Sequence, residues 1–275
     1  MRITILAHRD LHANRAVNLL RPALAEHQVT LCLSESVGKP RAGYVPPDGL
    51  QQLKFLEQEV FNTVLSPLAE RQDSTEERHL TFRELGAAFG TPTEVLASTN
   101  TRSGLERLVA SRPDLVVSIR YGCILRQRAI AVPRLGVLNL HSGLLPRYQG
   151  ILTTLHSLVE GRAEVGCTLH RIDSSMIDTG PIVATARIPV DPTHSLFWHI
   201  AQLYPAGCRL IADAIERLAR DQPLDAVPQD PDGAAYYGLP EPEHFDALAA
   251  RGIAVWHPDD LGPLYRRYLN ESEVG

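Results

Sequence analysis

The amino-acid sequence predicts an α/β fold, with a Rossmann-like, mostly parallel sheet and helices on both faces. Three observations predict it. The chain opens with a strand pattern, a helix pattern and a second strand pattern in succession. Two later runs, LVVSI at 115–119 and GVLNL at 136–140, are predominantly apolar, which is typical of strands buried on both faces. The chain has 275 residues, 44% of them hydrophobic, which is ample for a buried core in one large domain or two small ones.

The individual elements follow from the spacing of apolar residues. Residues 3–6 form a short β-rich run, residues 14–24 carry apolar side chains at helical spacing, and residues 28–33 form a second β-rich run. The same alternation resumes after Pro92. It predicts a helix at 103–110, strands at 115–119 and 136–140, a helix at 151–160, strands at 167–172 and 181–190, and a long helix at 195–220.

Two segments depart from this alternation. Residues 37–90 begin with a Gly/Pro-rich loop and continue with two helical patterns, so we interpret them as a helical excursion from the sheet. We favour a role in covering one sheet face over acceptor recognition or a dimer contact. The predicted division is a main domain at 1–194, followed by a C-terminal helix and small extension at 195–275. In that extension we expect one short helix, at 241–251, and little strand. Its apolar residues from Trp256 to Leu269 would pack on their own core or on a partner in a homodimer.

Composition excludes several classes of protein. The net charge is −5, which gives no general attraction for a nucleic-acid backbone. The four cysteines show no C-x-x-C pattern, so we expect buried free thiols in a reducing compartment and no metal. The apolar start of the chain is too short for a signal peptide, and no segment approaches the ~20 apolar residues of a membrane span. These features predict a cytoplasmic protein without a membrane partner.

The segment VLNLHSGLLPRYQG, at 137–150, contains the strongest candidates for chemistry. Asn139 and His141 point to the same face of a strand, because the side-chain period of a strand is two. They stand at its carboxyl end, where ligands bind in open parallel sheets. Taken alone, such a pair more often caps the strand end by bonding to loop backbone. The turn at 121–125 follows another buried strand and is a candidate backbone-lined pocket wall.

A polar loop downstream favours the functional interpretation. RIDSSMIDTGPIV places Asp173 and Asp178 between two strands, and the compact turn at 178–180 can present a carboxylate at a strand end. A carboxylate beside His141 orients the ring and stabilises its cationic form. Asn139 can then donate to a developing oxyanion while His141 donates or shuttles a proton. These three side chains suit a carbonyl carbon that becomes tetrahedral.

The Asn-x-His pair, the following LLPRYQG and the downstream Asp-Thr-Gly resemble the motif set of the folate-dependent formyltransferases. That family includes glycinamide ribonucleotide, methionyl-tRNA, sugar-amine and hydroxyornithine formyltransferases. The resemblance covers about 115–190, and more loosely the chain from its start. It implies a catalytic domain at 1–194, with Asn139, His141 and Asp178 as catalytic residues and 10-formyltetrahydrofolate as formyl donor. The segments expected to hold the pterin, largely through backbone, are Tyr121, Gly122, Cys123, Ile124 and Leu125 together with Asp173, Ile177 and Asp178.

The resemblance is incomplete in three places. Ser142-Gly143 follows the histidine where the family usually has Pro-Ser or Gly-Ser. Cys123 stands where some members have a cationic residue. The excursion at 37–90 is longer than the family core needs. These departures put loop geometry and folate contacts in question, and leave the three candidate catalytic residues in place.

The acceptor is the least determined part of the prediction. We expect the amine or hydroxylamine of a small molecule, either a sugar-nucleotide amine or a hydroxyornithine-like amine. Candidate acceptor contacts are His8, Arg9 and Asp10 after the first strand, and Tyr148, Gln149 and Gly150, the last of which matches the glycine that closes the family's active-site loop. For the first three we favour plain surface residues. No G-x-G-x-x-G follows the first strand, which counts against a dinucleotide cofactor.

Three alternative functions and the assignment of three histidines complete the prediction. A 10-formyltetrahydrofolate hydrolase ranks low, because the first strand starts at residue 3 where such hydrolases usually carry a preceding domain. A methionyl-tRNA formyltransferase ranks low because the chain is acidic and its last ~75 residues look short for a full barrel. A non-catalytic folate-binding protein is the rival from another class. His170 is assigned to a strand face, and His194 and His199 to structural roles, because their spacing is not that of a helical metal pair.

Overall fold

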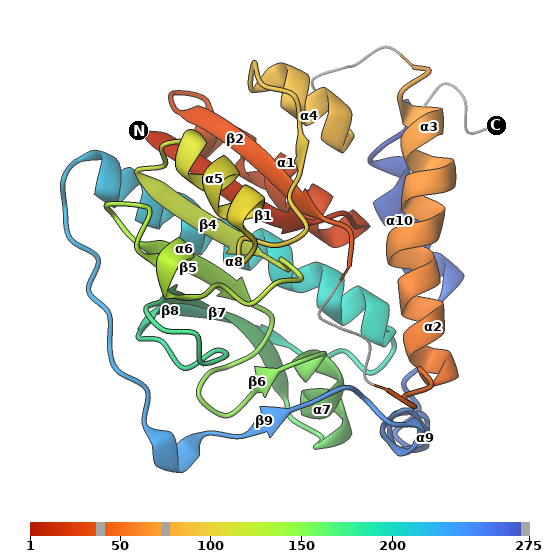
Figure 1. The fold of residues 1–275 in the computed structure, drawn as a ribbon. Coiled ribbons are helices and arrows are strands. Elements are labelled where there is room, and N and C mark those ends of the chain that lie inside the picture. Colours follow the sequence, from red (N-terminus) through yellow and green to blue (C-terminus); the bar gives the residue numbers. More distant parts are fainter. Residues whose placement is uncertain (37–41, 73–77, 271–275) are drawn as a thin grey trace.

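A seven-stranded mixed sheet forms the centre of the molecule in the computed structural model, which describes residues 1–36, 42–72 and 78–270 (Figure 1). Its strand order is β3-β2-β1-β4-β5-β7-β8. The first five strands in that order run parallel, and β7 and β8 are antiparallel. The bounds are β1 (Arg2–His8), β2 (Gln28–Ser34), β3 (Glu94–Val95), β4 (Leu115–Ile119), β5 (Val137–His141), β7 (Glu164–Ile172) and β8 (Ile182–Pro189). The predicted α/β fold with a mostly parallel sheet is confirmed. Among the strands of this sheet, the two-residue β3 is the one that was not foreseen.

Helices cover both faces of the sheet, as predicted. Alternate residues of the central strands enter different cores: in β1, Ile5 packs in the larger core and Leu6 in the smaller. The larger core lies under α1 (Leu11–Leu24) and α8 (Leu196–Ala219), and the smaller under α5 (Arg102–Ala110) and α6 (Gln127–Ile130). Burial on both faces explains why the central strands are mostly apolar.

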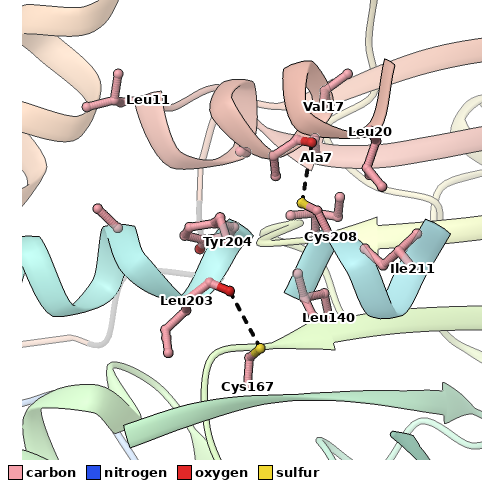
Figure 2. Close-up of a cluster of buried hydrophobic side chains, with 14 of the residues drawn as sticks. Ala7, Leu11, Val17, Leu20, Leu140, Cys167, Leu203, Tyr204, Cys208 and Ile211 are labelled. Carbon is pink, nitrogen blue, oxygen red and sulfur yellow. Dashed lines mark hydrogen bonds between the residues drawn. The ribbon is translucent and has the colours of Figure 1, made fainter. Parts of the chain in front are cut away.

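The long helix α8 packs on α1 and on strands β7 and β8. Figure 2 shows two cysteines in this layer, where Cys208 contacts the backbone of α1 and Cys167 that of α8. Cys32 is buried as well, but Cys123 is only half-buried. The expectation that all four thiols are buried is therefore wrong for Cys123, because it sits on a loop beyond the sheet.

The excursion forms one long helical rod beside the sheet (Figure 1). It consists of α2 (Asp48–Lys54), a π-helix η1 (Phe55–Leu65) and α3 (Ser66–Ala69), and is followed after a break by α4 (Phe82–Ala88). Phe61 and Leu65 of the rod are buried in the larger core. The rod therefore packs against the sheet layer through α1. Residues 37–41 and 73–77, which belong to the predicted excursion, lie outside the described residues.

The C-terminal extension returns to the edge of the molecule where the β5–β7 connection lies. A parallel pair of two-residue strands, β6 (Gln149–Gly150) and β9 (Tyr236–Tyr237), joins them. The remaining elements here are α7 (Thr153–Val159), the short 3₁₀ turn η2 (Pro231–Gly233), α9 (Pro242–Ala250) and α10 (Pro258–Arg266). The predicted short helix corresponds to α9, whereas α10 and β9 were not foreseen. Leu261, Leu264 and Tyr268 are buried in the chain's own core. Among the described residues no helix is both long and apolar enough to cross a membrane.

Candidate active site

The carboxyl ends of three parallel strands bring the candidate residues together. β1 ends at His8, β4 is followed by Arg120, and β5 carries Asn139 and His141. The strand order reverses around β1, because β2 and β3 lie on one side of it and β4 and β5 on the other. In open α/β sheets, such a switch point leaves a crevice at the strand ends where ligands bind. The site occupies that crevice.

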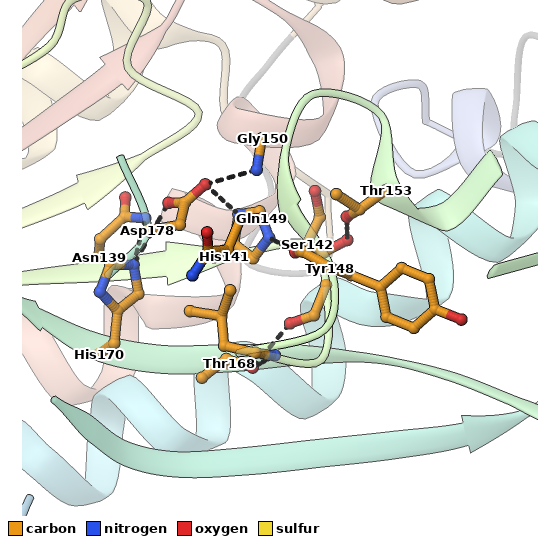
Figure 3. Close-up of polar contacts among 12 residues, drawn as sticks. Asn139, His141, Ser142, Tyr148, Gln149, Gly150, Thr153, Thr168, His170 and Asp178 are labelled. Carbon is orange, nitrogen blue, oxygen red and sulfur yellow. Dashed lines mark hydrogen bonds and ion pairs between the residues drawn. The ribbon is translucent and has the colours of Figure 1, made fainter. Parts of the chain in front are cut away.

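His141 lies between a loop carbonyl and a carboxylate (Figure 3). Its Nε2 is 2.6 Å from the Tyr148 carbonyl oxygen, and its Nδ1 is 3.4 Å from Asp178 Oδ2. A carbonyl oxygen only accepts hydrogen bonds, so Nε2 carries a proton and Nδ1 is the nitrogen that titrates against Asp178. Burial lowers the pKa of His141, and Asp178 opposes that effect. The pair is suited to exchange one proton at Nδ1.

Asp178 is largely buried, with 10% of its side chain exposed. It lies between two imidazoles, because its Oδ1 is also 3.5 Å from His170 Nε2, and its Oδ2 accepts a 2.9 Å hydrogen bond from the Gly150 amide. Although burial alone would raise the pKa of this carboxyl, His141 and the hydrogen bond from the Gly150 amide help to lower it to about 2. The carboxylate is therefore available as a fixed negative charge beside His141.

Asn139 is held by His170, which faces it across the antiparallel β5–β7 pair. His170 Nδ1 is 2.9 Å from the Arg171 carbonyl oxygen and must donate to it. Its Nε2 then accepts a 3.0 Å hydrogen bond from Asn139 Nδ2. One N–H of the Asn139 amide remains for a ligand. The sequence assigned His170 only to a strand face; nothing in a single strand pattern shows which residue lies opposite it.

Glycines and a left-handed aspartate shape the two loops. A Cβ atom at Gly143 would lie 2.7 Å from His141 Nε2, and one at Gly180 would lie 1.8 Å from the Arg171 carbonyl oxygen. Asp178 has a φ of 55°, a conformation that costs most residues energy but that Asp tolerates better than most. The Ser142-Gly143 sequence therefore has a physical reason, since a side chain at position 143 would collide with the His141 ring and the neighbouring loop.

Two cavities of about 320 Å³ each meet at these residues. We call the first the loop cavity; it is lined by the 121–125 turn and by residues 174–178. The second, the rod cavity, is lined by the excursion helix and the ends of β1 and β4. Their shared lining consists of Tyr121, Asn139, Gly150, Ile151, Ile177 and Asp178. Two ligands placed in the two cavities would therefore meet at Asn139 and Asp178.

A buried ion network forms the inner wall of the rod cavity. Arg120 Nε is 2.6 Å from Asp10 Oδ2, and Arg120 Nη2 is 2.5 Å from Glu57 Oε2. Asp10 also caps α1 through the Ala13 amide. Arg120 lowers the pKa of Glu57 to about 2 against the effect of burial, helped by His12. The network ties the excursion to the ends of β1 and β4 and keeps its charges fixed.

The predicted acceptor contacts separate into two groups. His8 and Asp10 are buried and line the rod cavity, so the favoured interpretation of plain surface residues is wrong for them. Their burial follows from the excursion, which covers the end of β1. Arg9 points elsewhere and lies 3.3 Å from Glu35. Of the second set, Gly150 lines both cavities, whereas Tyr148 and Gln149 turn their side chains toward Glu160 and Gln229.

The predicted donor segments lie around the loop cavity with one exception. Tyr121, Gly122, Cys123, Ile124, Leu125, Ile177 and Asp178 line it, while Asp173 is exposed and lines neither cavity. Sequence reasoning missed Glu57, Arg120, His170 and Tyr236, which also line the two cavities. Among the described residues, no group of three or more His, Cys, Asp or Glu side chains is arranged to hold a metal ion.

Comparison with known proteins shows which family this part of the chain resembles. The family model described as formyl transferase matches residues 83–202, which include Asn139, His141 and Asp178. A methionyl-tRNA formyltransferase from Ralstonia pickettii is 38% identical over 135 residues, which is 48% of this chain and 40% of that protein. The chain thus matches about two fifths of the length of this relative.

Solved structures show the same fold. A 4-N formyltransferase from Francisella tularensis superposes with a TM-score of 0.58 at 12% identity, covering 94% of this chain and 89% of that one. An N-formyltransferase from Helicobacter canadensis, in complex with folinic acid and dTDP-3-aminofucose, superposes with a TM-score of 0.53 at 17% identity, covering 86% and 71%. Residues 83–202 therefore resemble the formyl transferase family in sequence, and the chain as a whole resembles solved formyltransferases in fold.

Proposed function

We propose that this protein transfers a formyl group from 10-formyltetrahydrofolate to the amine or hydroxylamine of a small-molecule acceptor. One observation carries the proposal: Asn139 and Asp178 belong to the shared wall of two cavities, with His141 3.4 Å from Asp178. A transfer between two bound molecules needs such a meeting point, since positioning both reactants is a large part of catalysis.

The loop cavity suits the donor. Four of its lining side chains, Ile124, Met176, Ile177 and Tyr236, are large and apolar yet between 37% and 68% exposed. Exposed apolar side chains gathered around one cavity favour a flat, largely apolar ligand such as a pterin. The Helicobacter canadensis relative was solved with folinic acid, a formylated folate. The donor would supply an activated formyl carbon at the junction of the cavities.

Each candidate catalytic residue has a role in this transfer. The free N–H of Asn139 would stabilise the oxyanion that develops on the formyl oxygen when the amine nitrogen attacks. Nδ1 of His141, which faces Asp178, would accept the proton that the attacking nitrogen loses. The same proton would then pass to the departing folate nitrogen as its bond to the formyl carbon breaks. Asp178 would stabilise the imidazolium between the two steps.

The rod cavity would hold the acceptor. Its volume of about 320 Å³ suits a small molecule, and it is lined by Leu50, Leu53, Lys54 and Glu57 of the excursion. This supports a role of the excursion in acceptor recognition. The names of the relatives point to two classes of acceptor. The solved Helicobacter canadensis structure points to a sugar nucleotide, and the Ralstonia pickettii protein points to methionyl-tRNA. The net charge of −5 and the small cavity favour the small molecule.

The test is acceptor-dependent release of tetrahydrofolate from 10-formyltetrahydrofolate by the purified protein. The acceptor panel would contain amino-sugar nucleotides, hydroxyornithine-like amines, methionyl-tRNA and a sample without acceptor. We expect turnover with a small amine and a loss of ~100-fold or more in Asn139→Ala and His141→Ala. Turnover without acceptor would indicate a hydrolase, and folate binding without any turnover a non-catalytic protein; either result would refute the proposal.

A further inference from the structure

A segment outside the matched family region crosses both loops of the candidate site. After α8 the chain runs down one side of the molecule to β9, which pairs with β6 (Figure 1). We call residues 224–239 the C-terminal strap. At its start, Val227 and Ile182 exchange two backbone hydrogen bonds of 2.8 Å, which fixes the strap to the first residue of β8. The strap is therefore anchored just beyond the loop that carries Asp178.

One side chain of the strap holds that loop directly. Gln229 Nε2 donates hydrogen bonds to the carbonyl oxygens of Asp178 at 2.8 Å and of Gly180 at 2.7 Å. Both N–H groups of the amide are used in this way. Both carbonyls belong to the 178–180 turn, which starts with the left-handed Asp178, so the bonds fix a backbone conformation that a free loop would leave readily.

The far end of the strap holds the loop on the other side of the site. The backbone N–H of Gln149 donates to the Ala235 carbonyl at 2.9 Å, and the backbone N–H of Ile151 donates to the Tyr237 carbonyl at 2.8 Å. Gly150, which lies between Gln149 and Ile151, donates its backbone N–H to Asp178 Oδ2. The strap thus sets the distance between the loop that faces His141 and the loop that carries Asp178.

We propose that Gln229 is a positioning residue of the formyl-transfer site, which keeps the Asp178 carboxylate against His141 by binding two backbone carbonyls of the 178–180 turn. The inference rests on the proposed function for its catalytic consequence. The family model ends at residue 202, so the strap supplies this support from outside the segment that the family shares.

The test replaces Gln229 with methionine, which keeps the length of the side chain and removes both donors. The matched control is Gln222→Met, because Gln222 is an exposed glutamine near the start of the same C-terminal segment. We expect Gln229→Met to lower kcat at least tenfold, with less than a threefold change in the KM of the donor. Gln222→Met should leave both values unchanged.

A second measurement does not depend on turnover. Titration of the His141 imidazole by NMR, with its signal assigned by a His141→Gln variant, reports the nearby Asp178 charge. Asp178 raises the pKa of His141 against burial, so a displaced carboxylate should lower that pKa in Gln229→Met and leave it unchanged in Gln222→Met. If the wild-type protein shows no transfer, the proposed function has failed, and this titration still decides whether Gln229 positions Asp178.

Thermal melting separates positioning from support of the fold. A milder Gln229→Asn variant, which shortens the side chain but keeps its amide, is measured beside Gln229→Met. Folded variants with a wild-type His141 titration, whatever their melting temperature or kcat, would show that Gln229 only supports the fold and would overturn the inference. A lowered His141 pKa in the folded variants, together with lower kcat, would establish it.

Discussion

Replacement of Asp178 by asparagine tests the centre of the proposed mechanism. The change removes one charge and keeps the shape, and asparagine also tolerates the left-handed backbone at this position. Two unit charges 3.4 Å apart, the distance between Asp178 Oδ2 and His141 Nδ1, attract by about 5 kcal/mol at an effective dielectric constant of ~20. Allowing for the cost of burying the carboxylate, we expect kcat to fall by roughly 10³-fold, or about 4 kcal/mol.

The same variant has a predictable effect on stability. The pKa of Asp178 is lowered to about 2 in the folded protein, against roughly 3.9 in an unfolded chain. A lowered carboxyl pKa stabilises the fold above the unfolded value and loses that contribution as the pH falls toward the folded value. Asp178→Asn should therefore cost about 2 kcal/mol of unfolding free energy at pH 7, and the difference from wild type should shrink between about pH 4 and pH 2.

The assay measures kcat by acceptor-dependent release of tetrahydrofolate, and stability by urea unfolding at several pH values. Asp173→Asn is the matched control, since Asp173 lies in the same loop but is exposed and lines neither cavity. A folded Asp178→Asn protein that keeps kcat within tenfold of wild type would refute the assignment of Asp178 as the charge that stabilises protonated His141. An equal loss in Asp173→Asn would show that the loop, and not the charge at 178, matters.

Three further predictions follow from distances and burial. Gly180→Ala places a Cβ atom 1.8 Å from the Arg171 carbonyl oxygen, so it should cost about 2 kcal/mol or more in urea unfolding; a variant as stable as wild type would contradict the close approach. Glu57→Gln leaves the Arg120 guanidinium with one carboxylate partner fewer and should cost about 3 kcal/mol, while the exposed Glu106→Gln should be nearly neutral. Ile124→Asp should raise the donor KM at least tenfold with little change in kcat, because Ile124 lines the loop cavity. The control Val109→Asp, at an exposed position on α5, should leave the donor KM unchanged. Equal effects of the two substitutions would argue against a donor in that cavity.

The sheet and its helices could be predicted because each element carries its own periodicity. The buried strands are continuous apolar runs, and α8 spans Leu196–Ala219 where residues 195–220 show helical spacing. The short elements were missed for the same reason. β3 and β9 have two residues each, and α10 contains Pro263 and Gly262, so none of them produces a clear local pattern.

The site was predictable only in part. Asn139 and His141 share a face by strand periodicity, and the Asp-Thr-Gly turn marks Asp178. His170 and Gln229 could not be found in this way, because each acts on a residue 31 to 51 positions away along the chain. Their roles depend on the antiparallel register of β7 and on the path of the strap, neither of which is written in a local pattern.

The sequence by itself therefore determined the α/β fold, the strand ends that carry the chemistry and the three candidate catalytic side chains, since these follow from local periodicity and short motifs. Tertiary structure alone decided that two cavities meet at those side chains. It also decided that Asp10, Glu57 and Arg120 form one buried network, and that a C-terminal strap holds the Asp178 turn. The physical reason is that these arrangements join residues distant in sequence, whose encounter is fixed by packing and by the need to satisfy buried charges and backbone groups.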